Sequence, residues 1–157
     1  MNKKTTYVAQ AGMIAAVYAA ATLITLLALQ GLAWGPVQFR ISEAVCVLAV
    51  LTPAAVPGLT VGCIIANLMA LAINGTGALG MLDVVFGSLA TLIGAVGSWH
   101  LRRHEWLVCL PPIIANTLIV PWVLRYAYGA PDLIIYMIGT VGIGEILAIG
   151  VLGNTLL

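Results

Sequence analysis

Long apolar segments, separated by short stretches rich in glycine, proline or charged residues, follow one another along the whole chain. One bilayer crossing takes roughly 20 apolar residues, and most of these segments approach that length. Because lipid offers no hydrogen-bond partner to open backbone, such segments have to be helices with short connections. The pattern predicts helices at residues 7–29, 41–51, 58–73, 83–101, 106–124 and 133–157, of which the second is short for a crossing.

Composition supports this interpretation. Of the 157 residues, 62% are hydrophobic and only 7% are charged, which is typical of an integral membrane protein. The predicted fold class is therefore all-α integral membrane, a bundle of about six transmembrane helices in a single domain over residues 1–157, without room for a soluble domain. A net charge of +1 gives no indication of nucleic-acid binding.

The residues that often serve enzymes or metals lack a suitable pattern. Cys46, Cys63 and Cys109 lie far apart in apolar segments, where free cysteine acts as a small hydrophobic side chain. His100 and His104 have the spacing of a helical metal pair, but they flank a basic cluster that fits an interfacial anchor. We therefore expect no enzyme activity, no metal site and no cofactor.

Basic residues indicate the orientation in the membrane. If both termini are cytoplasmic, most of the basic side chains lie inside, in agreement with the positive-inside rule. We expect a multi-pass protein of the cell membrane in this orientation. The inner residues are then Lys3, Lys4, Arg102 and Arg103, and the outer ones Arg40 and Arg125.

Three polar residues interrupt apolar segments that lipid would otherwise tolerate: Asn67, Asn116 and Glu145. A carboxylate near the membrane centre costs about 2.5–3.5 kcal/mol, so Glu145 needs a partner, a proton or a water-filled cavity. This cost favours a ligand or ion site at Glu145. The alternative for all three residues is hydrogen bonding between neighbouring helices, which is common for single buried amides.

A second polar group lies before and at the start of the short helix at 41–51. Trp34, Gln38, Arg40 and Glu43 place an aromatic ring, an amide and two charges in one outer loop, which we expect to cover a binding pocket. The alternative is a local ion pair between Arg40 and Glu43, which are three residues apart. Asp83 either contributes to the same pocket or caps the helix that begins there.

Alanine recurs every four residues in the first helix, at Ala11, Ala15 and Ala19, with Ala16 and Ala20 beside them. Small side chains allow another helix to approach closely. The stripe therefore predicts a helix contact, either with another helix of the same chain or with a partner protein.

Five motifs follow one another over most of the chain: "GPVQFRISEAVCVL", "TPAAVPGLTVGCIIANL", "DVVFGSLATLIGA", "LPPIIANTLIV" and "VGIGE". In this order they resemble the QueT-type substrate-binding subunits, or S components, of energy-coupling factor transporters. The resemblance implies an S component that captures a queuosine precursor, such as queuine or a 7-deazaguanine intermediate. It also implies a partner module of two ATPases and a membrane scaffold, and it favours a scaffold-facing role for the Ala11, Ala15 and Ala19 stripe.

The chemistry of a 7-deazaguanine matches the polar residues. Its ring amide and exocyclic amine are donors that one carboxylate accepts together, which makes Glu145 the candidate, with Asn116 and Asn67 completing the contacts. Trp34 is placed to stack on the ring. Asp83 or Glu43 would pair with an aminomethyl cation if the ligand carries one.

Energy has to come from other subunits, because the sequence has no G-x-x-x-x-G-K-[ST] phosphate-binding loop. Two alternatives stay open. The chain is an S component for another vitamin-like small molecule, or it is a stand-alone proton-coupled transporter that uses Glu145 as its titrating group. The second fits poorly, because we see no inverted repeat.

Overall fold

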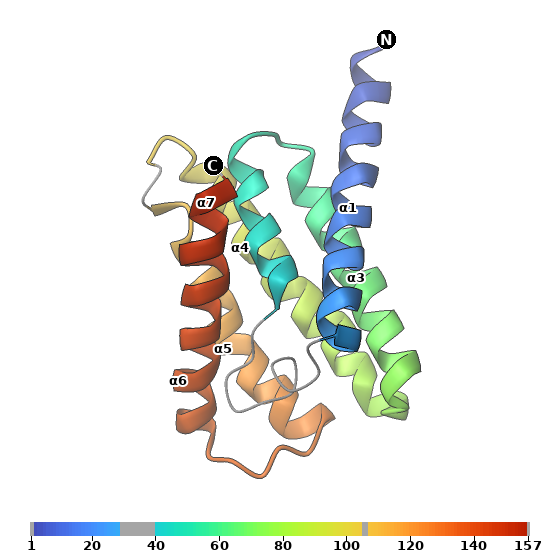
Figure 1. The fold of residues 1–157 in the computed structure, drawn as a ribbon, viewed down its shortest axis with the longest axis vertical. Coiled ribbons are helices and arrows are strands. Elements are labelled where there is room, and N and C mark those ends of the chain that lie inside the picture. Colours follow the sequence, from blue (N-terminus) through green and yellow to red (C-terminus); the bar gives the residue numbers. More distant parts are fainter. Residues whose placement is uncertain (1, 29–39, 105–106, 157) are drawn as a thin grey trace.

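Helices run up and down side by side in the computed structural model, which describes residues 2–28, 40–104 and 107–156 (Figure 1). No strand occurs within these described residues. The predicted all-α membrane fold is confirmed. The elements in chain order are α1 (Lys3–Ala28), η1 (Ile41–Val50), α3 (Ala55–Asn74), η2 (Gly77–Gly80), η3 (Asp83–Gly87), α4 (Ser88–His100), α5 (Leu110–Ala127), α6 (Ile134–Glu145), η5 (Ile146–Gly153) and α7 (Asn154–Leu156).

Several of these helices are long and apolar enough to cross a bilayer. Elements η2, η3 and α4 join into one long helical run, and α6 and η5 join into another. Helix α5 falls outside this group, because its three prolines, Asn116 and Arg125 make it less apolar. The shorter η1 is also apolar, as predicted. Within the described residues, the four candidate spans are Lys3–Ala28, Ala55–Asn74, Gly77–His100 and Ile134–Gly153.

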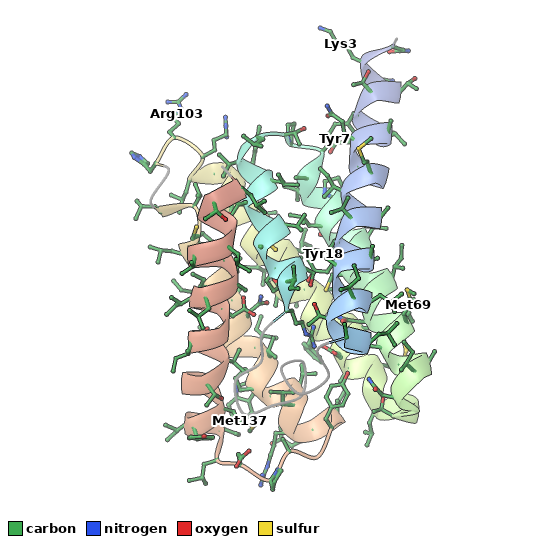
Figure 2. All side chains as sticks on the ribbon, in the orientation of Figure 1. Lys3, Tyr7, Tyr18, Met69, Arg103 and Met137 are labelled. Atoms are coloured by element: carbon green, nitrogen blue, oxygen red, sulfur yellow. The ribbon has the colours of Figure 1, made fainter. Side chains whose placement is uncertain are left out.

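Both termini lie at the same end of the bundle, and the first turns of α1 project beyond it (Figure 1). Lys3 and Arg103 also lie at this end, whereas Met137 lies toward the other end (Figure 2). Arg125 donates hydrogen bonds to the carbonyls of Ala130 and Asp132, in the connection from α5 to α6. The predicted grouping of basic residues by end therefore agrees with the fold, while the cytoplasmic placement of that end stays a prediction.

Helix boundaries differ from the predicted ones mainly near prolines and glycines. Helix α3 begins at Ala55, ahead of the predicted start, because Pro57 falls in its first turn, where proline is tolerated. Helix α5 begins at Leu110 with Pro111 and Pro112 in its first turn, rather than at 106, which lies outside the described residues. The predicted helix at 83–101 begins earlier, through η2 and the π-helical η3.

Close packing of α1 on α3 uses two glycines of α3. A Cβ added at Gly58 would lie 2.8 Å from the carbonyl oxygen of Ala11, and one at Gly62 would lie 2.9 Å from that of Ala15. Ala15 is buried in this contact. Ala11 and Ala15 therefore pack inside the chain, which is the intramolecular alternative raised above, and Ala15 is closed to a partner helix in this arrangement.

The outward-facing row of small residues on α1 is offset by one position from the predicted stripe. Gly12, Ala16 and Ala20 are exposed, whereas Ala19 is only partly so. A Cβ added at Gly12 would meet no heavy atom within 4 Å. An additional helix could therefore reach α1 closely along this row.

Candidate ligand-binding site

Three polar side chains from different helices meet inside the bundle. Glu43 comes from η1, Asn116 from α5 and Glu145 from the end of α6, and their exposed fractions are 4%, 3% and 7%. Burial of polar groups at this depth is costly unless they are hydrogen-bonded or serve a ligand. The hydrogen bonds of each group therefore distinguish a structural role from a binding role.

Glu43 is surrounded by neutral donors. The Tyr18 hydroxyl donates to its Oε1 at 2.6 Å, and the Asn116 amide donates to its Oε2 at 3.1 Å. The Cys46 thiol lies at 3.4 Å from the same Oε2. Glu43 was expected in an outer loop, but it lies in the first turn of η1, where these donors hold it in one position.

Tyr18 is one of the site residues that sequence reasoning missed. It lies at mid-height of the bundle (Figure 2) and is only 1% exposed. Tyr18 lies in the alanine-rich part of α1, where an aromatic side chain is usually an ordinary apolar packing residue. The available signal was its position three residues after Ala15, which places its hydroxyl on the face that α1 turns inward.

The carboxylate of Glu145 has fewer hydrogen-bond partners than that of Glu43. It interacts with the Asn116 side chain and with the charge of Glu43, but its Oε2 is buried and has no hydrogen-bond partner. Glu145 is the last residue of α6, and the helix continues as the π-helical η5, a geometry that often marks functional sites. An unpaired buried carboxylate oxygen calls for a donor, which a ligand, a water or an ion can supply.

A small cavity adjoins both carboxylates. Its volume is about 10 Å³ in this structure, which is roughly the space of one water. Pockets that hold drug-sized ligands reach about 300 Å³ or more, so a nucleobase needs the surrounding helices to move apart. The lining residues are Arg40, Glu43, Cys63, Gly87, Thr91, Asn116, Val120 and Glu145.

Asp83 forms a second polar group, next to Arg40. The Tyr128 hydroxyl donates to its Oδ2 at 2.8 Å, and the Arg40 guanidinium lies 3.7 Å from the same oxygen. Asp83 therefore does not cap the helix, since no side-chain capping bond occurs there. Within the described residues, Arg40 pairs with Asp83 rather than with Glu43, which contradicts the local ion pair considered above.

Tyr128 follows the end of α5. Burial, and then the neighbouring Asp83 carboxylate, raise the pKa of Tyr128 above its usual value. Its hydroxyl is therefore a neutral donor that links this end of α5 to η3. The contacts of Asp83 with Arg40 and Tyr128 thus connect η3 to the start of η1 and to the end of α5. Arg40 also lines the cavity.

Asn67 lies beside this group but does not line the cavity. Its amide donates to the backbone carbonyl of Asp83 at 2.9 Å, and the Cys63 sulfur lies at 3.5 Å. Asn67 thus joins α3 to η3, which is the helix-bridging role considered as its alternative. Trp34 and Gln38, expected to stack on and cover a ligand, lie outside the described residues.

A bundle of apolar helices with a buried, partly unsatisfied polar centre is an arrangement found in membrane proteins that bind polar small molecules. A family model described as QueT transporter matches residues 8–157, and the chain belongs to this family. This confirms the resemblance found in the sequence and, with the four candidate spans of the described residues, indicates a multi-pass transport protein. No curated protein and no solved structure matches the chain.

Proposed function

We propose that the chain is the substrate-binding subunit of an energy-coupling factor importer and captures a queuosine precursor, either queuine or a 7-deazaguanine intermediate. Membership of the QueT transporter family supports the substrate class. The observation that carries the proposal is the buried Oε2 of Glu145, which has no partner and adjoins a cavity. The bound ligand supplies the missing donor.

Deazaguanine chemistry suits this cavity. The ligand offers several N–H donors and one carbonyl acceptor, and Glu145 and Asn116 provide a carboxylate acceptor and an amide beside each other. Arg40 offers a planar guanidinium on the same cavity, on which an aromatic ring can stack. Each recognition element of a planar, donor-rich base therefore has a counterpart among the lining residues.

Transport in this proposal depends on partner subunits. The sequence lacks a phosphate-binding loop of the G-x-x-x-x-G-K-[ST] type, so ATP hydrolysis is assigned to the two ATPases of the coupling module. The scaffold subunit then contacts the outward row of α1, Gly12, Ala16 and Ala20, because Ala15 is occupied by α3.

Binding is tested by titrating the purified chain with queuine, 7-aminomethyl-7-deazaguanine and guanine. We expect saturable binding of at least one deazapurine and weaker binding of guanine. If no deazapurine binds while another vitamin-like compound does, the substrate assignment is wrong and the alternative S component is correct.

Energy coupling is tested by reconstituting the chain in vesicles with and without the scaffold and ATPases. We expect uptake only with the partners and ATP. Uptake by the chain alone, driven by a proton gradient, would instead establish the stand-alone transporter.

The partner face is tested with a matched pair of substitutions on α1. Ala16→Leu adds bulk on the exposed row and should abolish ATP-driven uptake while ligand binding persists. Ala15→Leu adds the same bulk against α3 and should lower thermal stability by about 1–3 kcal/mol. Equal effects of the two substitutions on uptake and stability would refute this division of the helix.

A further inference from the structure

Acidic side chains outnumber basic ones in the site. Three buried carboxylates, those of Glu43, Asp83 and Glu145, lie near one guanidinium, that of Arg40. Arg40 pairs with Asp83 at 3.7 Å, and the hydrogen-bond donors to Glu43 are all neutral. Glu43 and Glu145 therefore lack a cationic partner of their own among the described residues.

The rest of the chain cannot supply that cation. The sequence contains six lysines and arginines, and the five besides Arg40 all have exposed side chains. Both histidines, His100 and His104, are also exposed, and the His100 ring lies 2.8 Å from the Val96 carbonyl oxygen. Residues 1, 29–39, 105–106 and 157, outside the described part, contain no lysine, arginine or histidine. The exposed residues are Lys3, Lys4, Arg102, Arg103 and Arg125.

Space beside the two carboxylates suits an ammonium group. The cavity of about 10 Å³ is the size of one water, and an ammonium group is of similar size, whereas a purine ring is not. The Oε2 of Glu145 is free to accept, and an ammonium group carries three donors for this oxygen and its neighbours. The unsatisfied acceptor, the missing cation and the volume thus point to the same chemical group.

We propose that Glu43 and Glu145 form a cation subsite that holds the protonated primary amine of the ligand. The ligand class is then a deazapurine with an aminomethyl substituent, not a neutral base. This inference rests on the proposed function. It assigns Glu145 to the amine instead of to the donor edge of the ring, and it places the ring toward Arg40.

Two probes with the same ring test the subsite: 7-aminomethyl-7-deazaguanine and 7-methyl-7-deazaguanine, which lacks the amine. The unmodified chain should bind the aminomethyl compound at least about tenfold more tightly, since a charge-assisted hydrogen bond is among the stronger ones. Glu145→Gln should remove most of this preference and change the affinity for the methyl compound by less than about threefold.

Two further variants make the result independent of folding defects at position 145. Glu43→Gln should also reduce the preference. Asp132→Asn removes an exposed carboxylate in the connection between α5 and α6, and should leave the preference unchanged. Melting temperatures identify any variant that fails to fold, and the comparison of the two probes on the unmodified chain needs no variant.

The outcomes separate this inference from the function on which it rests. Equal affinity of the unmodified chain for the two probes overturns the cation subsite but leaves deazapurine binding in place. A Glu145→Gln variant that loses both probes to the same extent shows that Glu145 reads the ring edge, which also overturns the subsite. If the unmodified chain binds queuine but neither probe, only the cation subsite is overturned. If it binds neither the probes nor queuine, the proposed function is rejected together with the inference.

Discussion

Packing of α1 against α3 leads to a sharp prediction, because the two helices touch at Gly62. A Cβ at this position would lie 2.9 Å from the Ala15 carbonyl oxygen and 2.9 Å from the Tyr18 Cβ, and 3.0 Å from the Ala15 Cα. These atoms belong to backbone or to the start of a side chain, so they cannot turn aside. Gly62→Ala therefore forces the helices apart by several tenths of an ångström.

The expected magnitude follows from two opposing effects. Overpacking of this kind costs about 1–3 kcal/mol. Replacing glycine by alanine inside a helix recovers about 1 kcal/mol. The net destabilisation should be about 0–2 kcal/mol, centred near 1 kcal/mol. Because Tyr18 donates the 2.6 Å hydrogen bond to Glu43, separation of the helices should also weaken ligand binding.

Gly12→Ala is the matched control, since it makes the same chemical change on α1 where no heavy atom lies within 4 Å. It should leave stability unchanged or raise it slightly. The assay compares melting temperatures at one scan rate and in one detergent, because membrane proteins often unfold irreversibly, and adds a ligand titration. If Gly62→Ala melts at the same temperature as Gly12→Ala or higher, the close approach of α1 and α3 is wrong.

Three other substitutions test the site and its support. Tyr18→Phe removes the shortest donor to Glu43 and should cost about 1–3 kcal/mol by thermal unfolding, with weaker ligand binding; an unchanged affinity would contradict the role of this bond. Tyr128→Phe removes the donor to Asp83 and should cost about 1 kcal/mol in the same assay, and no loss would mean that this contact is dispensable. Gly94→Ala would place a Cβ 2.6 Å from the Cα of Pro112, in the first turn of α5. The melting temperature of this variant should fall, and an unchanged melting temperature would show that α4 and α5 are less closely packed.

Much of the candidate site could be anticipated from the cost of polar groups in lipid. Glu145 and Asn116 stand out in apolar segments, and both line the cavity. Arg40 and Glu43 were predicted site residues because they are charges at the start of a short helix, and both line the cavity as well. Their partners could not be inferred, because Tyr18 is 25 residues from Glu43 and Tyr128 is 45 residues from Asp83.

The sequence by itself determined the class of protein, the approximate helices and the family, because apolar length and motif order are properties of consecutive residues. Only the tertiary structure decided which face each helix turns inward. On α1 the spacing of small residues supports two adjacent rows equally well, and Gly58 and Gly62 of α3 select the one with Ala11 and Ala15. Packing of η1 against the α6–η5 run likewise brings Glu43 and Glu145 to one cavity with Arg40, and this meeting of distant charges cannot be read from consecutive residues.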